Sequence, residues 1–590
     1  MRINKCAPVL FCVKTVSISC NVLKVCSTYH ALFARTVATI FPITRNGIGI
    51  GGSVWNDTIL FMGPLVQGII RGYPQPAVYP VQEICKYKKN DSSKKLYICS
   101  VNLLVMLRKL FCLVVAAVLM APAAVFAQNN VQRYVDTAIK TDTLFKNAAV
   151  AILAVDGRGK TVAQWNPDLP LLSASTMKTI TTGVALDVLG PDFKFETKIA
   201  YAGTIDDEGV LHGDLYIIGG GDPTLGSHSL IAEDINLVFA QWTDAVKGAG
   251  ITAIDGKVKG DAGIFKDGII QDNWCWADLG TDYGNGPCGL SFAENLSYYC
   301  VTPGPFEGDS LLITPVEAVY SRMNLQLSAT TGAPKTGNKL TYYSSDLSPV
   351  GRFTGTYAAD RRTDTIAVSN KFPSLTLAES FSVYLATEGI QTRGAGLGAA
   401  PDTAALLATT YSPFLSDICR ETNTKSNNFF AETLFMMLSL HLADEASYAK
   451  APKAVEEYIA AAGCNTTGLR QDDGSGLSRF NFVSPRFYCN FYRMMQKSNI
   501  FASYLASLPT PGGEGTLKYV LSKEPESLRS RIHCKSGSMT AVKCYAGYVE
   551  TAGGELLRFA IMVNNYDCPT RLIQPKIEGF LKQLAQYERQ

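Results

Sequence analysis

The stretch LLSASTMK, residues 171–178, determines how the rest of this chain is interpreted. It places Ser175 three residues before Lys178, at the start of a segment with apolar residues at helical spacing up to Gly190-Pro191. Residues three apart in a helix share a face, so we expect the serine hydroxyl to lie beside the lysine amine. A desolvated, neutral lysine can remove the serine proton and create a nucleophile. Taken alone, the tetrapeptide is more typical of a helix cap followed by a solvated lysine.

Residues 106–127 have every part of a secretory signal peptide: a basic start, an apolar centre and a small-residue cleavage site before Gln128. Signal peptides act at N-termini, so we expect Met106 to be the true start and residues 1–105 to be a spurious upstream extension. The alternative is a genuine domain that tethers the protein to the inner membrane. We expect the mature protein to be exported to the periplasm, without a stable membrane span.

Charge and cysteine content narrow the possible functions. The whole chain has a net charge of +3, but residues 128–590 carry 40 Lys and Arg against 48 Asp and Glu, a net charge of −8. An acidic protein without a basic patch is not expected to bind nucleic acid. Residues 128–590 contain nine cysteines without a CxxC motif, so at least one thiol stays unpaired; a pair of Cys275 with Cys288 or Cys300 is the first to test. No histidine motif for a metal is present, and we expect no cofactor.

The secondary structure that the sequence predicts changes twice along the chain. Residues 148–165 predict a hairpin around an Asp-Gly turn, directly before the Ser175 segment. Residues 196–384 are rich in short strand-like runs, and helical periodicity then returns before a second hairpin at 544–564 and a final amphipathic helix expected to pack on the sheet. We therefore expect one domain built from 128–195 and 385–590, with 196–384 inserted as one or two β-rich domains.

Two later motifs supply the partners that Ser175 and Lys178 need. Ser426-Asn427-Asn428 opens an apolar helix, and KSGS at 535–538 precedes the C-terminal hairpin. Each has an ordinary structural explanation, for example Ser426 as a helix cap. Together and in this order they correspond to the Ser-x-x-Lys, Ser-Asp-Asn and Lys-Thr-Gly set of serine acyl-transfer enzymes.

From about residue 130 to 585 the chain resembles the class C low-molecular-mass penicillin-binding proteins, the D-alanyl-D-alanine carboxypeptidase/endopeptidase family. Five further stretches carry this resemblance: GDLYIIGGGDPTL at 213–225, the Trp-rich segment at 274–295, SNNFFAE at 426–432, DDGSGLSR at 472–479 and LPTPGGEGTL at 508–517. Ser426 follows Ser175 by 251 positions, which leaves room for the insertion typical of this family that a compact β-lactamase lacks. Asn427 and Ser536 depart from the commoner Asp and Thr, and both keep a polar side chain.

The resemblance implies an α/β (α+β) fold, namely a β-lactamase/transpeptidase-like domain with an antiparallel sheet, flanking helices and a helical subdomain, carrying the β-rich insertion. It implies a serine-type carboxypeptidase and/or endopeptidase that cleaves peptidoglycan stem peptides or cross-links through an acyl-enzyme on Ser175. Peptidoglycan peptides and β-lactam antibiotics are the implied partners.

The resemblance also implies roles for the motif residues. Ser175 would be the nucleophile and Lys178 its general base, with burial and the charge of Lys535 lowering the pKa of Lys178. Ser426 would relay a proton to the leaving amine, and Asn428 would hold Lys178 and the substrate amide.

The third motif would bind the end of the substrate. Lys535 and the hydroxyls of Ser536 and Ser538 would hold the terminal carboxylate, with Gly537 between them. Backbone N–H groups of Ser175 and Ser538 would form the oxyanion hole.

Two other functions fit the same motifs. One is a serine β-lactamase or esterase on this scaffold, which the long insertion disfavours. The other is a non-catalytic peptidoglycan-binding or penicillin-sensing protein, which predicts the loss of a motif residue, and none is lost. A Ser-His-Asp hydrolase would require Gly-x-Ser-x-Gly, which the sequence lacks.

Overall fold

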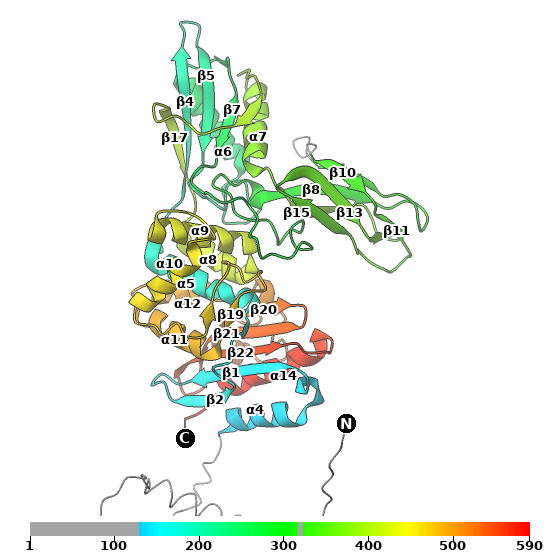
Figure 1. Ribbon diagram of the computed structural model, residues 1–590, viewed down its shortest axis with the longest axis vertical. Coiled ribbons are helices and arrows are strands. Elements are labelled where there is room, and N and C mark those ends of the chain that lie inside the picture. Colours follow the sequence, from blue (N-terminus) through cyan, green and yellow to red (C-terminus); the bar gives the residue numbers. More distant parts are fainter. Residues whose placement is uncertain (1–128, 317–322, 590) are drawn as a thin grey trace, which may run out of the picture. The chain divides into compact units, whose positions relative to one another are not determined.

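The computed structural model describes residues 129–316 and 323–589 (Figure 1). The expected upstream extension at 1–105 and signal peptide at 106–127 lie outside the described residues. In the described part of the chain, no helix has both the length and the apolar character needed to cross a bilayer.

A five-stranded antiparallel sheet brings the two ends of the described chain together. The predicted hairpins are present, and they join through the pairing of β1 with β22, in which Ala149 lies opposite Asn564. The strand order is β2-β1-β22-β21-β20, so β20 forms an open edge. The strands are β1 (Ala149–Val155), β2 (Thr161–Trp165), β20 (Ile532–Met539), β21 (Val542–Glu550) and β22 (Leu556–Asn564).

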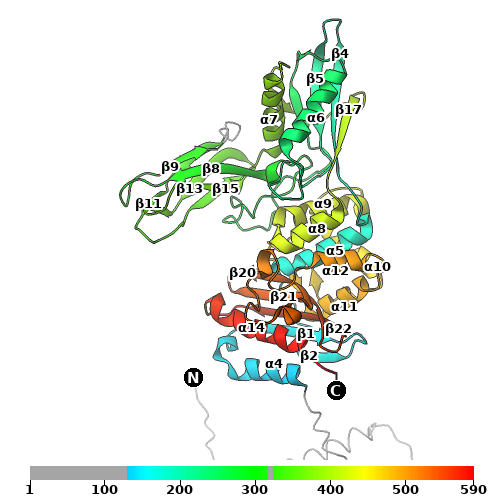
Figure 2. The ribbon, with the colours of Figure 1, turned by 180° about the vertical axis from the view of Figure 1, so that it is seen from behind.

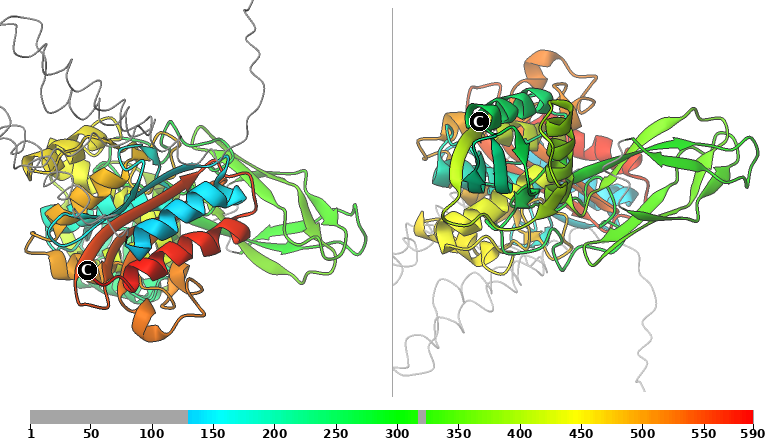
Figure 3. Two further views of the ribbon diagram at one scale, coloured as in Figure 1. Left: turned by 90° about the horizontal axis from the view of Figure 1, so that it is seen from below. Right: turned by 90° about the horizontal axis from the view of Figure 1, so that it is seen from above.

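One face of this sheet is covered by the first and last helices of the described chain, α4 (Asn130–Thr141) and α14 (Thr570–Ala585), which lie side by side (Figure 3). Ile577 and Phe580 of α14 are buried with Val131 and Val135 of α4 against the sheet. The last helix therefore packs on the sheet, as its apolar face predicted.

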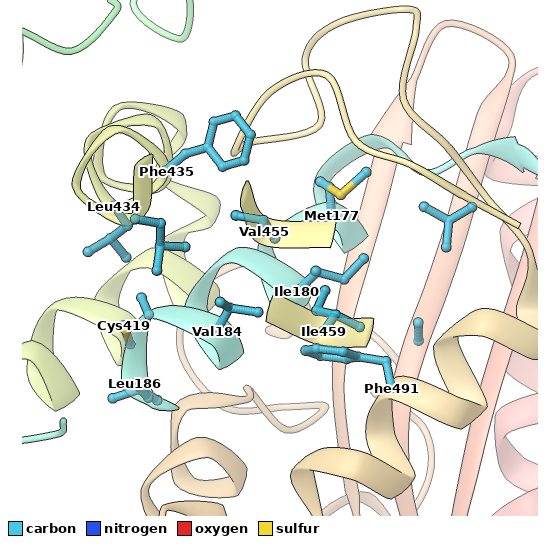
Figure 4. Packing of buried hydrophobic residues seen from close by; sticks show 14 of the residues in the cluster. Met177, Ile180, Val184, Leu186, Cys419, Leu434, Phe435, Val455, Ile459 and Phe491 are labelled. Atoms are coloured by element: carbon cyan, nitrogen blue, oxygen red, sulfur yellow. The ribbon is translucent and has the colours of Figure 1, made fainter. Parts of the chain in front are cut away.

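On the other face, α11 packs on β1, β21 and β22, and a group of helices lies beyond it with α5 at its centre. Every residue of α5 from Lys178 to Leu186 is buried, so this helix is enclosed on all sides. Ile180 and Val184 lie among apolar side chains of neighbouring helices (Figure 4). The helices are α5 (Lys178–Leu189), α8 (Leu415–Glu421), α9 (Asn428–Ala443), α10 (Ala451–Ala461), α11 (Pro485–Met495) and α12 (Phe501–Ser507).

Between α5 and α8 the chain forms a second sheet with strand order β16-β7-β5-β4-β17, and β6 also pairs with β5. Helices α6 (Ile235–Gly248) and α7 (Pro373–Thr387) pack against it (Figure 2). The rings of Trp242 and Phe381 meet edge to face in the core between them. The strands are β4 (Glu196–Ile205), β5 (Val210–Ile218), β6 (Ala253–Ile254), β7 (Val258–Asp261), β16 (Ala395–Leu397) and β17 (Ala405–Tyr411).

This second sheet extends past residue 384, where the sequence placed the end of the insertion. Its last strand, β17, pairs with β4 and ends at Tyr411. Helix α7, most of which lies inside the expected insertion, packs on β7 and β16, and the strands β16 and β17 that follow residue 384 belong to this second sheet as well. Helical periodicity identifies a helix but not the sheet that it covers.

A third group of strands occupies residues 296–369 around a core that includes Tyr299, Phe353 and Tyr357. The sheets have strand orders β15-β8-β9, β10-β13-β12 and β11-β14. The strands are β8 (Leu296–Thr302), β9 (Leu312–Pro315), β10 (Asn324–Leu327), β11 (Thr330–Gly332), β12 (Thr341–Ser345), β13 (Ser348–Thr354), β14 (Thr356–Ala358) and β15 (Asp364–Ser369).

All nine cysteines in the described residues are free thiols. Cys275 is exposed, and it pairs with neither Cys288 nor Cys300. The thiol of Cys288 lies 3.2 Å from the hydroxyl of Ser374 instead. The disulfide chosen for the first test is therefore not formed.

Candidate active site

Ser175 lies in a short 3-10 turn, Ala174–Met177, that leads directly into α5. The Nζ of Lys178 donates a hydrogen bond of 3.1 Å to the Oγ of Ser175. A further short strand, β3 (Leu171–Leu172), enters the turn and pairs with β19 (Phe482–Val483), which in turn pairs with β18 (Leu469–Arg470). The turn is thus anchored at one end by a strand and at the other by the buried helix.

Lys178 is fully buried, and its amine has two further acceptors. It donates to Oδ1 of Asn428 at 2.6 Å and to the backbone oxygen of Ser475 at 2.8 Å. Burial lowers the pKa of Lys178 to about 7, against the opposing effect of the carboxylates of Glu432 and Asp473. A substantial fraction of this lysine is therefore neutral near pH 7, the form that can accept a proton.

Lys535 is also fully buried, and its Nζ donates to Oγ of Ser426 at 2.9 Å. The pKa of Lys535 is lowered well below its usual value by burial first, and then by the charges of Lys178 and Lys543. We expected the repulsion between the two lysines to lower the pKa of Lys178, but it lowers the pKa of Lys535 instead. For Lys178 itself, burial is the cause of the lowered pKa.

The Ser426–Asn428 segment joins a π-helical turn, Thr422–Ser426, to α9. Asn427, not Ser426, caps α9: its Oδ1 accepts from the backbone N–H of Phe430 at 3.0 Å. Ser426 adopts a left-handed backbone conformation, φ +63°, which costs energy for a residue other than glycine. Its hydroxyl is therefore directed to Lys535 and is not used as a helix cap.

The departure at Asn427 has a structural partner. The Nδ2 of Asn427 donates to Oε2 of Glu294 at 2.7 Å. An aspartate there would have no N–H to donate and would place a second carboxylate against Glu294. Asparagine at 427 is thus matched to the glutamate that the inserted region presents to it.

Strand β20 carries the third motif at the open edge of the sheet. A Cβ on Gly537 would lie 2.6 Å from the backbone oxygen of Ser173 and 3.2 Å from the backbone nitrogen of Thr176. Only glycine allows β20 to approach the Ser175 turn this closely. Lys535 and Ser536 are buried and Ser538 is exposed, so the motif runs from the interior to the rim.

Sequence reasoning missed two buried carboxylates behind Lys178. Both oxygens of Glu432 accept from the 472–479 loop, from Gly474 N–H at 3.0 Å and from Ser475 N–H at 2.7 Å. Asp473 accepts from Trp274 Nε1 at 2.9 Å. Burial and repulsion by Asp473 raise the pKa of Glu432 to about 8, and burial raises the pKa of Asp473. The signal was available, because Glu432 lies in SNNFFAE and Asp473 in DDGSGLSR.

The inserted region reaches the site through the backbone of Tyr283. The Nδ2 of Asn428 donates to the Tyr283 oxygen at 2.9 Å, which leaves the Asn428 oxygen to Lys178. Tyr283 also lines a cavity of about 610 Å³ between the 277–283 loop and strands β12, β13 and β15. The insertion therefore orients a motif residue and adds a recess beside it.

The described residues contain no group of three or more His, Cys, Asp or Glu side chains arranged to hold a metal. His533, two residues before Lys535, is partly buried, and burial lowers its pKa. The buried ionisable groups around Ser175 are thus lysines and carboxylates.

Comparison with known proteins agrees with this geometry. The D-Ala-D-Ala carboxypeptidase 3 (S13) family matches residues 131–584. A D-alanyl-D-alanine carboxypeptidase of Actinomadura sp. (strain R39) is 29% identical over 472 residues, covering 76% of this chain and 84% of the relative. The D-alanyl-D-alanine carboxypeptidase DacB of Haemophilus influenzae is 25% identical over 437 residues, covering 72% of this chain and 87% of the relative.

The fold is shared with a solved structure. Penicillin binding protein 4 (dacB) from Haemophilus influenzae superposes with a TM-score of 0.67 at 23% identity, over 77% of this chain and 99% of the other. The α+β fold with a β-lactamase/transpeptidase-like domain is thereby confirmed. Since the family match spans most of the chain, it decides against the β-lactamase or esterase and the non-catalytic protein that the motifs left open. The chain belongs to the D-Ala-D-Ala carboxypeptidase 3 (S13) family, and it is a serine-type carboxypeptidase.

Proposed function

We propose that this enzyme removes the terminal D-alanine of peptidoglycan stem peptides, and opens D-alanyl cross-links, through an acyl-enzyme on Ser175. One observation carries the proposal: a fully buried lysine with a pKa of about 7 donates a hydrogen bond to the hydroxyl of Ser175. Among the described residues this lysine has no carboxylate within 4.0 Å, so nothing pairs with its ammonium form. Lys178 is thus prepared to act as a base.

In the acylation step, Ser175 Oγ attacks the carbonyl carbon of the penultimate D-alanine while Lys178 takes its proton. The proton then has to reach the leaving amine. Ser426, held by Lys535 at 2.9 Å, provides a hydroxyl for that transfer. Asn428 holds Lys178 in place and can contact the substrate amide.

The edge strand supplies the binding groups. Lys535 and the hydroxyls of Ser536 and Ser538 bind the terminal carboxylate, and the backbone N–H groups of Ser175 and Ser538 form the oxyanion hole. An edge strand has backbone groups free on its outer side, which suits both tasks. Loss of one oxyanion-hole donor in a comparable enzyme lowers the rate by about 10²–10³.

In the second step, water attacks the acyl-enzyme and releases the shortened peptide. The carboxylates of Glu432 and Asp473 accept from backbone N–H groups, whereas Lys178 lies 3.1 Å from Ser175 Oγ and can serve as the base. After the leaving amine takes its proton, Lys178 is neutral again and can activate water.

We also propose that the enzyme acts in the periplasm and is acylated by β-lactams. The signal-peptide pattern at 106–127 and the acidic charge of residues 128–590 support export. The Haemophilus influenzae protein of the same fold is known in complex with a β-lactam. N-terminal sequencing of the exported protein tests the first point, and a start near Gln128 is the expected result.

The experiment that tests the function is labelling with a fluorescent penicillin followed by peptide mass mapping. We expect one adduct on Ser175, which Ser175→Ala abolishes while the fold is kept. A folded wild-type protein that stays unlabelled would overturn the proposal. Purified muropeptides then separate the two activities: release of D-alanine from pentapeptides shows the carboxypeptidase, and conversion of dimers to monomers shows the endopeptidase.

A further inference from the structure

A third buried lysine lies directly behind the proposed carboxylate site. Lys543 on β21 is the cross-strand partner of Ser538 on β20. Directly opposite residues in an antiparallel pair place their side chains on the same face of the sheet. The Nζ of Lys543 accordingly donates to the Oγ of Ser538 at 2.8 Å. The lysine is only 8% exposed, whereas the serine lies at the exposed rim.

The surroundings of Lys543 leave its charge without a close counter-ion. Within the described residues no carboxylate lies within 4.0 Å of its amine, and the Ser538 hydroxyl is its one hydrogen-bond acceptor. Burial lowers the pKa of Lys543, while the more distant Glu578 on α14 raises it. Glu578 itself accepts from the backbone N–H of Leu521 and from Gln574. The ring of Tyr545, with its centroid 5.1 Å from the amine, offsets part of the cost of burying this ammonium group, and a bound anion would offset more.

The hydrogen bond between Lys543 and Ser538 can have only one donor, the lysine ammonium group. An ammonium group has donors only, so the Ser538 oxygen must accept from Lys543. The proton of the Ser538 hydroxyl then remains free to be donated elsewhere. It can reach an acceptor at the rim, where the proposed function places the substrate carboxylate.

The charge of Lys543 also acts on the proposed site of the substrate carboxylate. Lys535 and Ser538 lie three positions apart on β20, so their side chains are on opposite faces of the sheet. Lys543 shares the face of Ser538, and the two lysines therefore approach the motif from opposite faces. Burial and the charge of Lys178 do most to lower the pKa of Lys535, and the charge of Lys543 lowers it further. An anion bound at the serine hydroxyls between the two lysines would relieve the repulsion between their charges.

We propose that Lys543 is a positioning and specificity-determining residue for the terminal carboxylate: it orients the Ser538 hydroxyl as a donor and adds a second positive charge. The inference rests on the proposed function. A ligand that ends in a neutral group gains nothing from this charge. Lys543 therefore makes the enzyme favour substrates with a free carboxylate over otherwise identical uncharged ones.

The test compares two ligands on one enzyme. A D-alanyl thioester whose leaving group ends in a carboxylate is measured against the same thioester ending in a carboxamide. Lys543→Met keeps an unbranched side chain of similar length and removes the charge. A hydrogen bond to a charged group is typically worth one to two powers of ten. We expect kcat/KM for the acid to fall about tenfold or more and that for the amide to change less than about threefold.

Two further variants separate charge from packing. Lys543→Arg keeps the charge, and we expect it to restore most of the preference for the acid. Lys371→Met is the matched control, because Lys371 is another buried lysine and donates to Leu279 O and Ser369 Oγ in the inserted region. Its acid-to-amide ratio should equal that of the wild type. If Lys543→Met fails to fold by circular dichroism, Lys543→Gln takes its place in the comparison.

The outcomes distinguish this inference from the function on which it rests. An unchanged acid-to-amide ratio in Lys543→Met, or an equal loss for both ligands, overturns the role of Lys543. Continued labelling of Ser175 by penicillin in that case leaves the proposed function intact. Absence of labelling in the wild type overturns the function itself.

Discussion

Replacing Glu432 with glutamine tests how the 472–479 loop holds Lys178. The carboxylate accepts from Gly474 N–H at 3.0 Å and Ser475 N–H at 2.7 Å, and the Ser475 oxygen accepts from Lys178 Nζ at 2.8 Å. A glutamine amide has one oxygen, so its NH₂ would face one of these N–H groups. A buried N–H without an acceptor costs about 1–3 kcal/mol. We expect Glu432→Gln to lower the free energy of unfolding by about this amount.

The same substitution should change the pH dependence of acylation. The Glu432 carboxylate opposes burial by raising the pKa of Lys178, so its removal lets that pKa fall below about 7. The neutral base is then present at lower pH, and the rise of the acylation rate with pH shifts in that direction. Since Glu432 has a pKa of about 8 and titrates in the same range, we expect a shift of less than about one unit.

The assay is the second-order rate of acylation by a fluorescent penicillin between about pH 5 and pH 9. Tyr448→Phe is the control, because it removes only the hydroxyl that donates to Glu432 Oε2 at 3.1 Å and leaves both loop contacts. We expect that variant to cost about 1 kcal/mol and to keep the wild-type profile. A Glu432→Gln profile that stays in place or moves to higher pH would refute the reasoning.

Three further predictions concern single residues. Gly537→Ala should reduce the rate of acylation by about 10²-fold or more while the fold is retained, because the new Cβ would lie 2.6 Å from the backbone oxygen of Ser173 and push β20 away from Ser175. Labelling with penicillin measures this rate, and a wild-type rate would contradict the prediction. Asn427→Asp should lower stability by about 1–3 kcal/mol at pH 7 and by less at pH 4, where one carboxylate of the pair with Glu294 is protonated; thermal unfolding at both pH values checks it. Between about pH 7 and pH 10 the unfolding free energy of the wild type should rise relative to that of Lys178→Met, because Lys178 binds a proton in the unfolded state that it has lost in the folded state. The shift of its pKa from 10.5 to about 7 corresponds to a few kcal/mol. A difference in unfolding free energy that does not change with pH would contradict this prediction.

Local sequence was enough to predict the elements that short-range rules control. The spacing of Ser175 and Lys178 predicts two side chains on one side of a helical turn, and they lie 3.1 Å apart. Alternating apolar runs around turn residues predict the two hairpins, which the structure contains. Local patterns failed where an element's partner lies far along the chain: residues 405–411 were assigned to the first domain, but they form β17, which pairs with β4 of the second sheet.

By itself, the sequence determined the order of the three motifs, the spacing of Ser175 and Lys178, and the class of enzyme to which they point. These follow from residue type and spacing of up to four positions, which the geometry of a helix or strand converts directly into contacts. The tertiary structure alone decided the chemical state of those residues. Lys178 has a pKa of about 7 because α5 is enclosed by helices whose residues are hundreds of positions away, and Glu432 and Asp473 lie behind it for the same reason. Lys543 meets Ser538 only through the register of β20 and β21, since burial and cross-strand pairing depend on long-range packing.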